Sequence, residues 1–160
     1  MRTGIRKRAD LLPTASATRS DEARGHLARA IQTYLEGYRA DFRDAYPGIN
    51  AATLMECEAA VRPEQAEILP VVLYAAKQRL ASVAPDYWDY ATTLELRVLA
   101  RDQTGADEVL AAALAMGRES WEFKTTADNL QYIVEARAGR GEDVKWIEGI
   151  VTELRNRAKA

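Results

Sequence analysis

The stretch Asp86-Tyr-Trp-Asp-Tyr-Ala-Thr-Thr-Leu-Glu-Leu-Arg-Val-Leu-Ala-Arg101 carries the clearest helical pattern in the chain. At about 100° per residue, one face of a helix collects the apolar side chains of Trp88, Ala91, Val98 and Leu99, with Leu94 and Leu96 at its margins. The opposite face collects Asp89, Thr93 and Arg97 at steps of four, which predicts an exposed polar stripe. The stretch is therefore expected to be an amphipathic helix with one side in a core.

Glu95 departs from this pattern because it falls near the centre of the apolar face. A carboxylate in such a place needs a partner or a proton. Arg79 also falls among apolar residues, on the preceding helical stretch, which a short turn at Ala84-Pro85 brings back antiparallel. We therefore predict a buried or half-buried ion pair between Arg79 and Glu95, with Arg137 as the alternative partner of Glu95. In the competing interpretation, the Arg79 stem reaches along the surface to water and Glu95 lies at a helix edge.

Composition restricts the class of protein. The chain has 160 residues, of which 48% are hydrophobic and 29% charged, as in a soluble globular domain. The formal net charge of −2 does not favour nucleic acid as a partner. One cysteine, Cys57, and one histidine, His26, argue against a disulfide framework, a histidine metal site and a Ser-His-Asp triad. No apolar run reaches the roughly 18 residues of a membrane span, so we expect a cytoplasmic protein that does not bind membranes.

Caps, turns and apolar spacing divide the chain into a basic arm and about seven helices. Residues 1–19 are basic without a period and are interpreted as a flexible arm, and residues 20–160 as a single helical domain. The expected helices cover residues 20–42, 51–60, 70–83, 86–100, 106–116, 126–138 and 142–158. Tyr46–Asn50 is expected to be a turn whose last residue caps a helix, and Pro70 to lie in a first helical turn. Trp121 is expected to be an apolar residue of a loop.

The second half of the chain repeats a helix-turn-helix pattern. Residues 86–100 pair with 106–116, and residues 126–138 pair with 142–158. Gly105 and Gly141 occupy matching turns, 36 positions apart. A tetratricopeptide repeat has a similar hairpin and a period of about 34 residues. The predicted fold class is therefore all-α, a tetratricopeptide-like α-solenoid of about seven antiparallel helices.

Three segments add a family resemblance. They are Asp44-Ala-Tyr-Pro-Gly-Ile-Asn-Ala-Ala-Thr-Leu54, Asp86-Tyr-Trp-Asp-Tyr-Ala-Thr-Thr-Leu-Glu95 and Trp121-Glu-Phe-Lys-Thr-Thr-Ala-Asp-Asn-Leu130. In this order they resemble the TRAF-binding domain of the apoptosis signal-regulating kinases, in a bacterial-type stand-alone form. The resemblance covers roughly residues 34–154. It implies a tetratricopeptide-like regulatory domain that binds a signalling protein. The chain has neither the Gly-rich phosphate loop nor the catalytic Asp loop of a kinase, so kinase activity is not implied, and neither is the kinases' own adaptor.

The leading functional prediction is a non-catalytic scaffold module, regulatory in signalling, that binds a protein partner in a helical groove. Stacked helix pairs create an extended concave surface suited to this use. The polar stripe supplies the candidate partner-binding residues, which are Asp89, Tyr90, Thr93 and Arg97. No cofactor and no metal ion are expected.

Three other functional hypotheses follow from the sequence. A small molecule or nucleotide could be sensed between helices by Tyr87, Trp88, Trp121 and Arg79, although core packing explains these aromatic residues better. An acidic enzyme site at Asp86, Asp89 and Glu95 is disfavoured, because Asp89 and Glu95 fall on opposite helix faces. Trp146, near the start of the last helix, suggests a weak tendency to form a homodimer.

Overall fold

The computed structural model describes residues 21–160, and this part of the chain is all helical. Its helices are α2 (Asp21–Ala40), α3 (Ala45–Glu56), α4 (Glu64–Leu80), α5 (Tyr87–Leu99), α6 (Gln103–Met116), α7 (Ser120–Gly139) and α8 (Lys145–Arg157). The predicted fold class and the predicted number of helices are thereby confirmed for the described residues. The arm predicted for residues 1–19 lies outside them.

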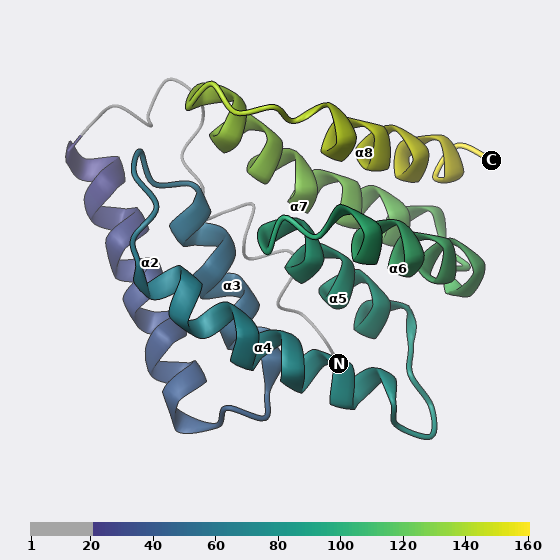
Figure 1. Ribbon diagram of the computed structural model, residues 1–160, viewed down its shortest axis with the longest axis horizontal. Coiled ribbons are helices and arrows are strands. Elements are labelled where there is room, and N and C mark those ends of the chain that lie inside the picture. Colours follow the sequence, from purple (N-terminus) through teal and green to yellow (C-terminus); the bar gives the residue numbers. More distant parts are fainter. Residues whose placement is uncertain (1–20) are drawn as a thin grey trace.

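Consecutive helices pack as hairpins, and the first members of the pairs also meet. Contacts join α2 to α3, α3 to α4, α5 to α6 and α7 to α8, while α3, α5 and α7 contact one another. Figure 1 shows α2, α3 and α4 grouped at one end and α5 to α8 at the other. This arrangement is consistent with the predicted solenoid. Helix α5 contacts α3, α4, α6 and α7, so it has neighbours on several sides and lies in the middle of the stack.

The core follows this arrangement. The larger cluster of buried apolar residues draws on all helices from α3 to α8 and includes Leu94, Leu96, Leu130, Ile133 and Ile147. A smaller cluster fills the α2–α3 hairpin with Ile31, Leu35, Ala51, Leu54 and Met55. Burial of such side chains is the main favourable term in folding.

Helix α3 begins earlier than predicted, because Pro47 and Gly48 lie inside it and not in a turn. Asp44 is the N-cap, and its carboxylate accepts a hydrogen bond of 3.0 Å from the Tyr46 amide. Pro47 is the third residue of the helix, where a missing N–H costs nothing. Asn50 is therefore not a cap; its side-chain amide donates to the Tyr46 carbonyl oxygen at 2.6 Å.

Gly48 serves helix packing. A Cβ at this position would lie 2.5 Å from Cγ2 of Val72 and 3.0 Å from a ring carbon of Tyr38. Only glycine lets α3 approach α4 this closely. A turn was predicted here because Pro-Gly is a turn signal, and close helix packing gives the same pair of residues another use.

Helix α4 also begins earlier than predicted, at Glu64, so Pro70 is the seventh residue of the helix and lies in its interior. Proline removes one backbone hydrogen bond there. Pro70 and Ala66 are both exposed, so water can reach the carbonyl group of Ala66 that the missing N–H would have bonded.

Three further starts differ from the prediction. Asp102 caps α6 through a 2.9 Å bond from the Gly105 amide, in place of Thr104. Helix α7 starts at Ser120, which puts Trp121 in its first turn and not in a loop. Helix α8 starts at Lys145, three residues later than expected.

Candidate functional site

The polar stripe predicted on α5 is not exposed as a whole. Asp89 and Thr93 are buried, with 4% and 1% of their surfaces exposed, while Tyr90 and Arg97 are half-buried. The Thr93 hydroxyl donates to the Asp89 carbonyl oxygen at 2.9 Å. The expectation of an exposed stripe assumed a helix with one solvent face. Because α5 is central and packs against four other helices, part of its polar side is covered as well.

Arg79 and Glu95 have other partners than the predicted ones. The Arg79 guanidinium lies 3.2 Å from the Asp89 carboxylate and is 53% exposed, whereas that carboxylate is 3% exposed. Glu95 is buried, as predicted, and accepts a 2.6 Å hydrogen bond from the Thr53 hydroxyl of α3. The reason is the reach of the hairpin. Arg79 near the end of α4 faces Asp89 in the first turn of α5. Glu95 lies six residues beyond Asp89, which is about 9 Å along the helix at a rise of about 1.5 Å per residue.

Arg137, the alternative partner of Glu95, is the largest fully buried side chain and lies on a different carboxylate. Its Nε is 3.0 Å from Oε1 of Glu56. Its two terminal nitrogens donate to the carbonyl oxygens of Val98 and Leu99, each at 3.1 Å. These carbonyl groups belong to the C-terminal turn of α5, where helical N–H partners run out, although the Val98 oxygen also accepts from the Arg101 amide at 3.1 Å. Arg137 therefore joins the C-terminal ends of α3, α5 and α7.

Glu56 is held by several donors, which form a buried polar centre. Arg140 pairs with its carboxylate and also donates to the Glu56 carbonyl oxygen at 2.7 Å. Gln65 of α4 donates to the same carboxylate at 2.9 Å. Burial raises the pKa of Glu56, but hydrogen bonds from Arg137 and Gln65 and the charges of Arg137 and Arg140 outweigh it, so the pKa is lowered. Because the centre ties several helices to one carboxylate, we expect it to fix how these helices align along their axes.

Sequence reasoning missed Glu56. A signal was present, because residues 51–57 read Ala-Ala-Thr-Leu-Met-Glu-Cys and contain no other charge. A lone carboxylate in such a segment is buried with the segment, and it then requires a cation from elsewhere in the fold.

A second feature lies where α5 and α7 begin, and it reaches the surface. Four aromatic rings form a continuous ladder, which we name the aromatic end: Tyr87, Trp88, Trp121 and Phe123. The Trp121 ring is tilted by 36° against Trp88 with centroids 5.4 Å apart, and Trp88 meets Tyr87 edge-on at 5.1 Å. Tyr87 meets Phe123 edge-on at 5.5 Å. Trp121 is 55% exposed, whereas Tyr87 and Phe123 are buried.

The inner half of the aromatic end is rigidly packed. The Tyr87 hydroxyl lies 2.7 Å from the hydroxyl of Thr126. Burial raises the pKa of Tyr87 to about 12, with the Thr126 hydrogen bond lowering it and the charge of Glu122 adding to the rise. A Cβ at Gly117, between α6 and α7, would overlap the Phe123 ring. The structure thus brings together three members of the predicted ligand-sensing set, while the fourth, Arg79, is bound to Asp89.

Two other features are missing from residues 21–160. No group of three or more His, Cys, Asp or Glu side chains in this range is arranged to hold a metal ion. None of the helices described combines the length and the hydropathy needed to cross a bilayer. Asp86 and Asp89, two members of the disfavoured acidic site, form a capping box at the start of α5.

Comparison with known proteins gives one match. The family model of the MAP3K TRAFs-binding domain matches residues 13–151, which is most of the chain. No match was found among curated proteins or among solved structures.

Proposed function

The chain belongs to the MAP3K TRAFs-binding domain family, and from this premise we propose that it is a non-catalytic module that binds a partner protein. The observation that supports this most is Trp121, a large aromatic side chain that is 55% exposed and packs at a tilt against the Trp88 ring. Tryptophan is enriched among the few residues that carry most of the binding energy of protein interfaces. An indole held in one orientation also loses little entropy on binding.

The proposed binding surface is the exposed side of the aromatic end. Tyr90 and Arg97 are half-buried on the side of α5 that faces away from Trp88, about 180–200° around the helix, so they stay proposed as a second, separate set of contacts. Asp89 and Thr93 are buried; Asp89 pairs with Arg79 and Thr93 donates to the Asp89 carbonyl oxygen, so both are proposed to support α5 and not to contact the partner. The regulatory role in signalling belongs to the same proposal and rests on family membership alone.

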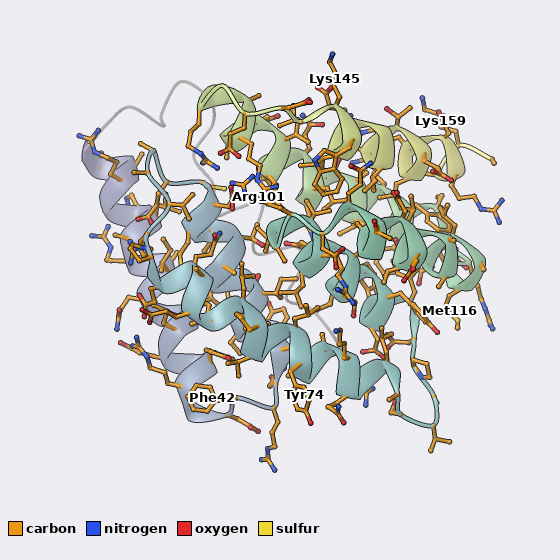
Figure 2. All side chains as sticks on the ribbon, viewed as in Figure 1. Phe42, Tyr74, Arg101, Met116, Lys145 and Lys159 are labelled. Atoms are coloured by element: carbon orange, nitrogen blue, oxygen red, sulfur yellow. The ribbon has the colours of Figure 1, made fainter. Side chains whose placement is uncertain are left out.

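Affinity capture from the native cell lysate tests the proposal. The bait is compared with a Trp121→Ala variant and with a Tyr74→Ala variant, because Tyr74 on α4 is 65% exposed and serves as a matched control. Figure 2 shows Tyr74 on a different side of the molecule from Met116, the last residue of α6 beside the aromatic end. We expect a protein that is captured by the parent and by the Tyr74 variant and is lost with the Trp121 variant. Partners that are retained equally by all three baits would contradict this surface.

Weak self-association through α8 is proposed as well. Trp146 is half-buried and packs against the core, so any dimer would use the outer face of α8 around it. Light scattering over a wide range of protein concentration checks this. A mass that rises above 17.8 kDa with concentration is expected, and a constant monomer mass would exclude the dimer.

A further inference from the structure

We infer that the aromatic end binds an acidic peptide segment that presents an aromatic or long aliphatic anchor. This inference rests on the proposed function and adds the chemistry of the partner to it. The anchor is implied by the exposed indole of Trp121, which offers an apolar face next to Trp88. The acidic character is implied by two arginines beside the rings.

The first arginine is Arg157, near the end of α8. Its guanidinium carbon is 6.0 Å from the centre of the Phe123 ring, and the residue is exposed. The second is Arg118, which is also exposed and follows Gly117, the residue that abuts Phe123 and Tyr87. Arg157 therefore lies beside the Phe123 ring of the aromatic end, and Arg118 directly follows a residue that abuts the same ring.

These two arginines differ from most others in residues 21–160. Ion pairs to described carboxylates within 4.0 Å engage Arg39, Arg43, Arg62, Arg79, Arg97, Arg101, Arg137, Arg140 and Arg155. Within the same range, neither Arg118 nor Arg157 has a carboxylate at that distance. The nearby Glu122 is turned to the backbone, since its Oε2 accepts from the amides of Arg118 and Glu119 at 2.9 and 3.0 Å. Two guanidinium groups are thus left for carboxylates of a partner.

A peptide fits this arrangement better than a nucleic acid. A single-stranded nucleic acid also stacks on aromatic rings, but it needs a row of cations that follows its phosphates. Here the cations are two, and the whole chain has a formal net charge of −2. An apolar anchor between acidic residues matches the rings and both arginines.

The test is calorimetric titration of the full chain with three synthetic peptides. One has a Leu-Phe anchor flanked by glutamates, the second has the same anchor flanked by lysines, and the third has glutamates with serines in place of the anchor. We expect binding of the first alone, weakening as salt is added. Trp121→Ala should weaken it by roughly thirtyfold, the loss that is typical of a hot-spot residue.

Charge variants separate the two parts of the inference. Reversing both cations, Arg118→Glu with Arg157→Glu, should weaken binding of the acidic peptide by about tenfold and remove most of its salt dependence. The matched control is Lys145→Glu, an exposed cation at the opposite end of α8 that should change nothing. Figure 2 shows Lys145 at the start of this helix and Lys159 just beyond its end.

Several results would overturn the inference. They are equal binding of the lysine-flanked peptide, tighter binding of a single-stranded oligonucleotide, an unchanged affinity of the doubly reversed variant, and no binding of any peptide. The last result would leave the proposed function to the capture experiment, where a partner that depends on Trp121 would still support it.

Discussion

Glu56 shows how one buried carboxylate can organise several helices. Its side chain is 1% exposed and receives Arg137 and Arg140 from the end of α7 together with Gln65 from α4. Arg140 also pairs with Glu142 at 2.9 Å, and Glu142 in turn receives Arg101 of the α5–α6 turn at 2.6 Å. A chain of ion pairs therefore runs from the buried centre to the turns at the surface.

Removal of this charge should be costly. Glu56→Gln leaves Arg137 buried without its counter-ion, and breaking a buried pair in this way typically costs about 3–5 kcal/mol of unfolding free energy. Glu64→Gln is the control, because its pair with Arg39 is partly exposed and is expected to contribute at most about 1 kcal/mol. Urea denaturation of both variants measures the difference. Equal losses would show that the buried centre has no special weight.

The lowered pKa of Glu56 gives this centre a pH dependence. Because the folded-state pKa lies below the ordinary value of 4.5 for a glutamate, the carboxylate stabilises the fold above that pH. The stabilisation is lost as pH falls through the folded-state pKa. Acid unfolding of the parent should therefore be steeper in this window than that of Glu56→Gln. Parallel acid titration curves for the two proteins would refute the assignment.

The raised pKa of Tyr87 predicts a loss of stability at high pH. Its pKa is raised from 10.0 to about 12, so the folded state holds the phenol proton more tightly than the unfolded chain. The resulting stabilisation is complete below pH 10 and is lost as pH rises towards 12. Tyr87→Phe should flatten this decline, at a cost of about 1 kcal/mol at neutral pH for the lost hydrogen bond to Thr126. Melting temperatures between these pH values check it, and an unchanged slope would refute it.

At the scale of single residues, periodicity predicted the burial of Glu95 but not that of Asp89 and Thr93, and it predicted none of the partners. Periodicity placed Glu95 inside correctly, because burial depends on the angle around one helix. Its partner depends on how far along the neighbouring helices the residue lies. That distance is set by the lengths of the loops and the positions of the helix ends. In the structure Arg79 therefore pairs with Asp89, and Arg137 pairs with Glu56.

At the scale of elements, two glycines in helices should respond in opposite ways to the same substitution. Gly48→Ala should destabilise the protein, because the new Cβ would lie 2.5 Å from Val72 at the α3–α4 contact. Gly149→Ala should stabilise it by up to about 1 kcal/mol, because this exposed position in α8 has nothing within 4 Å of a new Cβ. Thermal unfolding of both variants measures the signs. A stabilising Gly48→Ala would mean that α3 and α4 are less closely packed.

Helix existence was predictable from the sequence, and helix starts were less so. Apolar spacing identified each helix, since each must bury a face. Pro47 and Pro70 were read as boundaries, yet the first lies where no helical hydrogen bond is required and the second lies on an exposed side of its helix. Which of these situations applies depends on packing that local sequence does not encode.

At the scale of the whole molecule, the repeating helix pairs and the family could be predicted, whereas the exposed surface could not. A helical wheel assigns a single buried side to each helix, whereas α5 has neighbours on several sides because it lies in the middle of the stack. The same stacking leaves Trp121 exposed. The sequence pattern, which predicted an apolar residue in a loop, did not indicate this exposure. Which residues of a solenoid are exposed therefore depends on how its helices stack, and one helix considered alone does not show it.

The most direct measurement is site-specific photo-crosslinking in the native cell extract. A photoreactive phenylalanine analogue replaces Trp121 in one protein and Tyr74 in another, since both positions are exposed aromatic residues. We predict a discrete crosslinked protein product from position 121 that position 74 does not give. The same product from both positions, or from position 74 alone, would contradict the claim that the aromatic end is where this protein binds its partner.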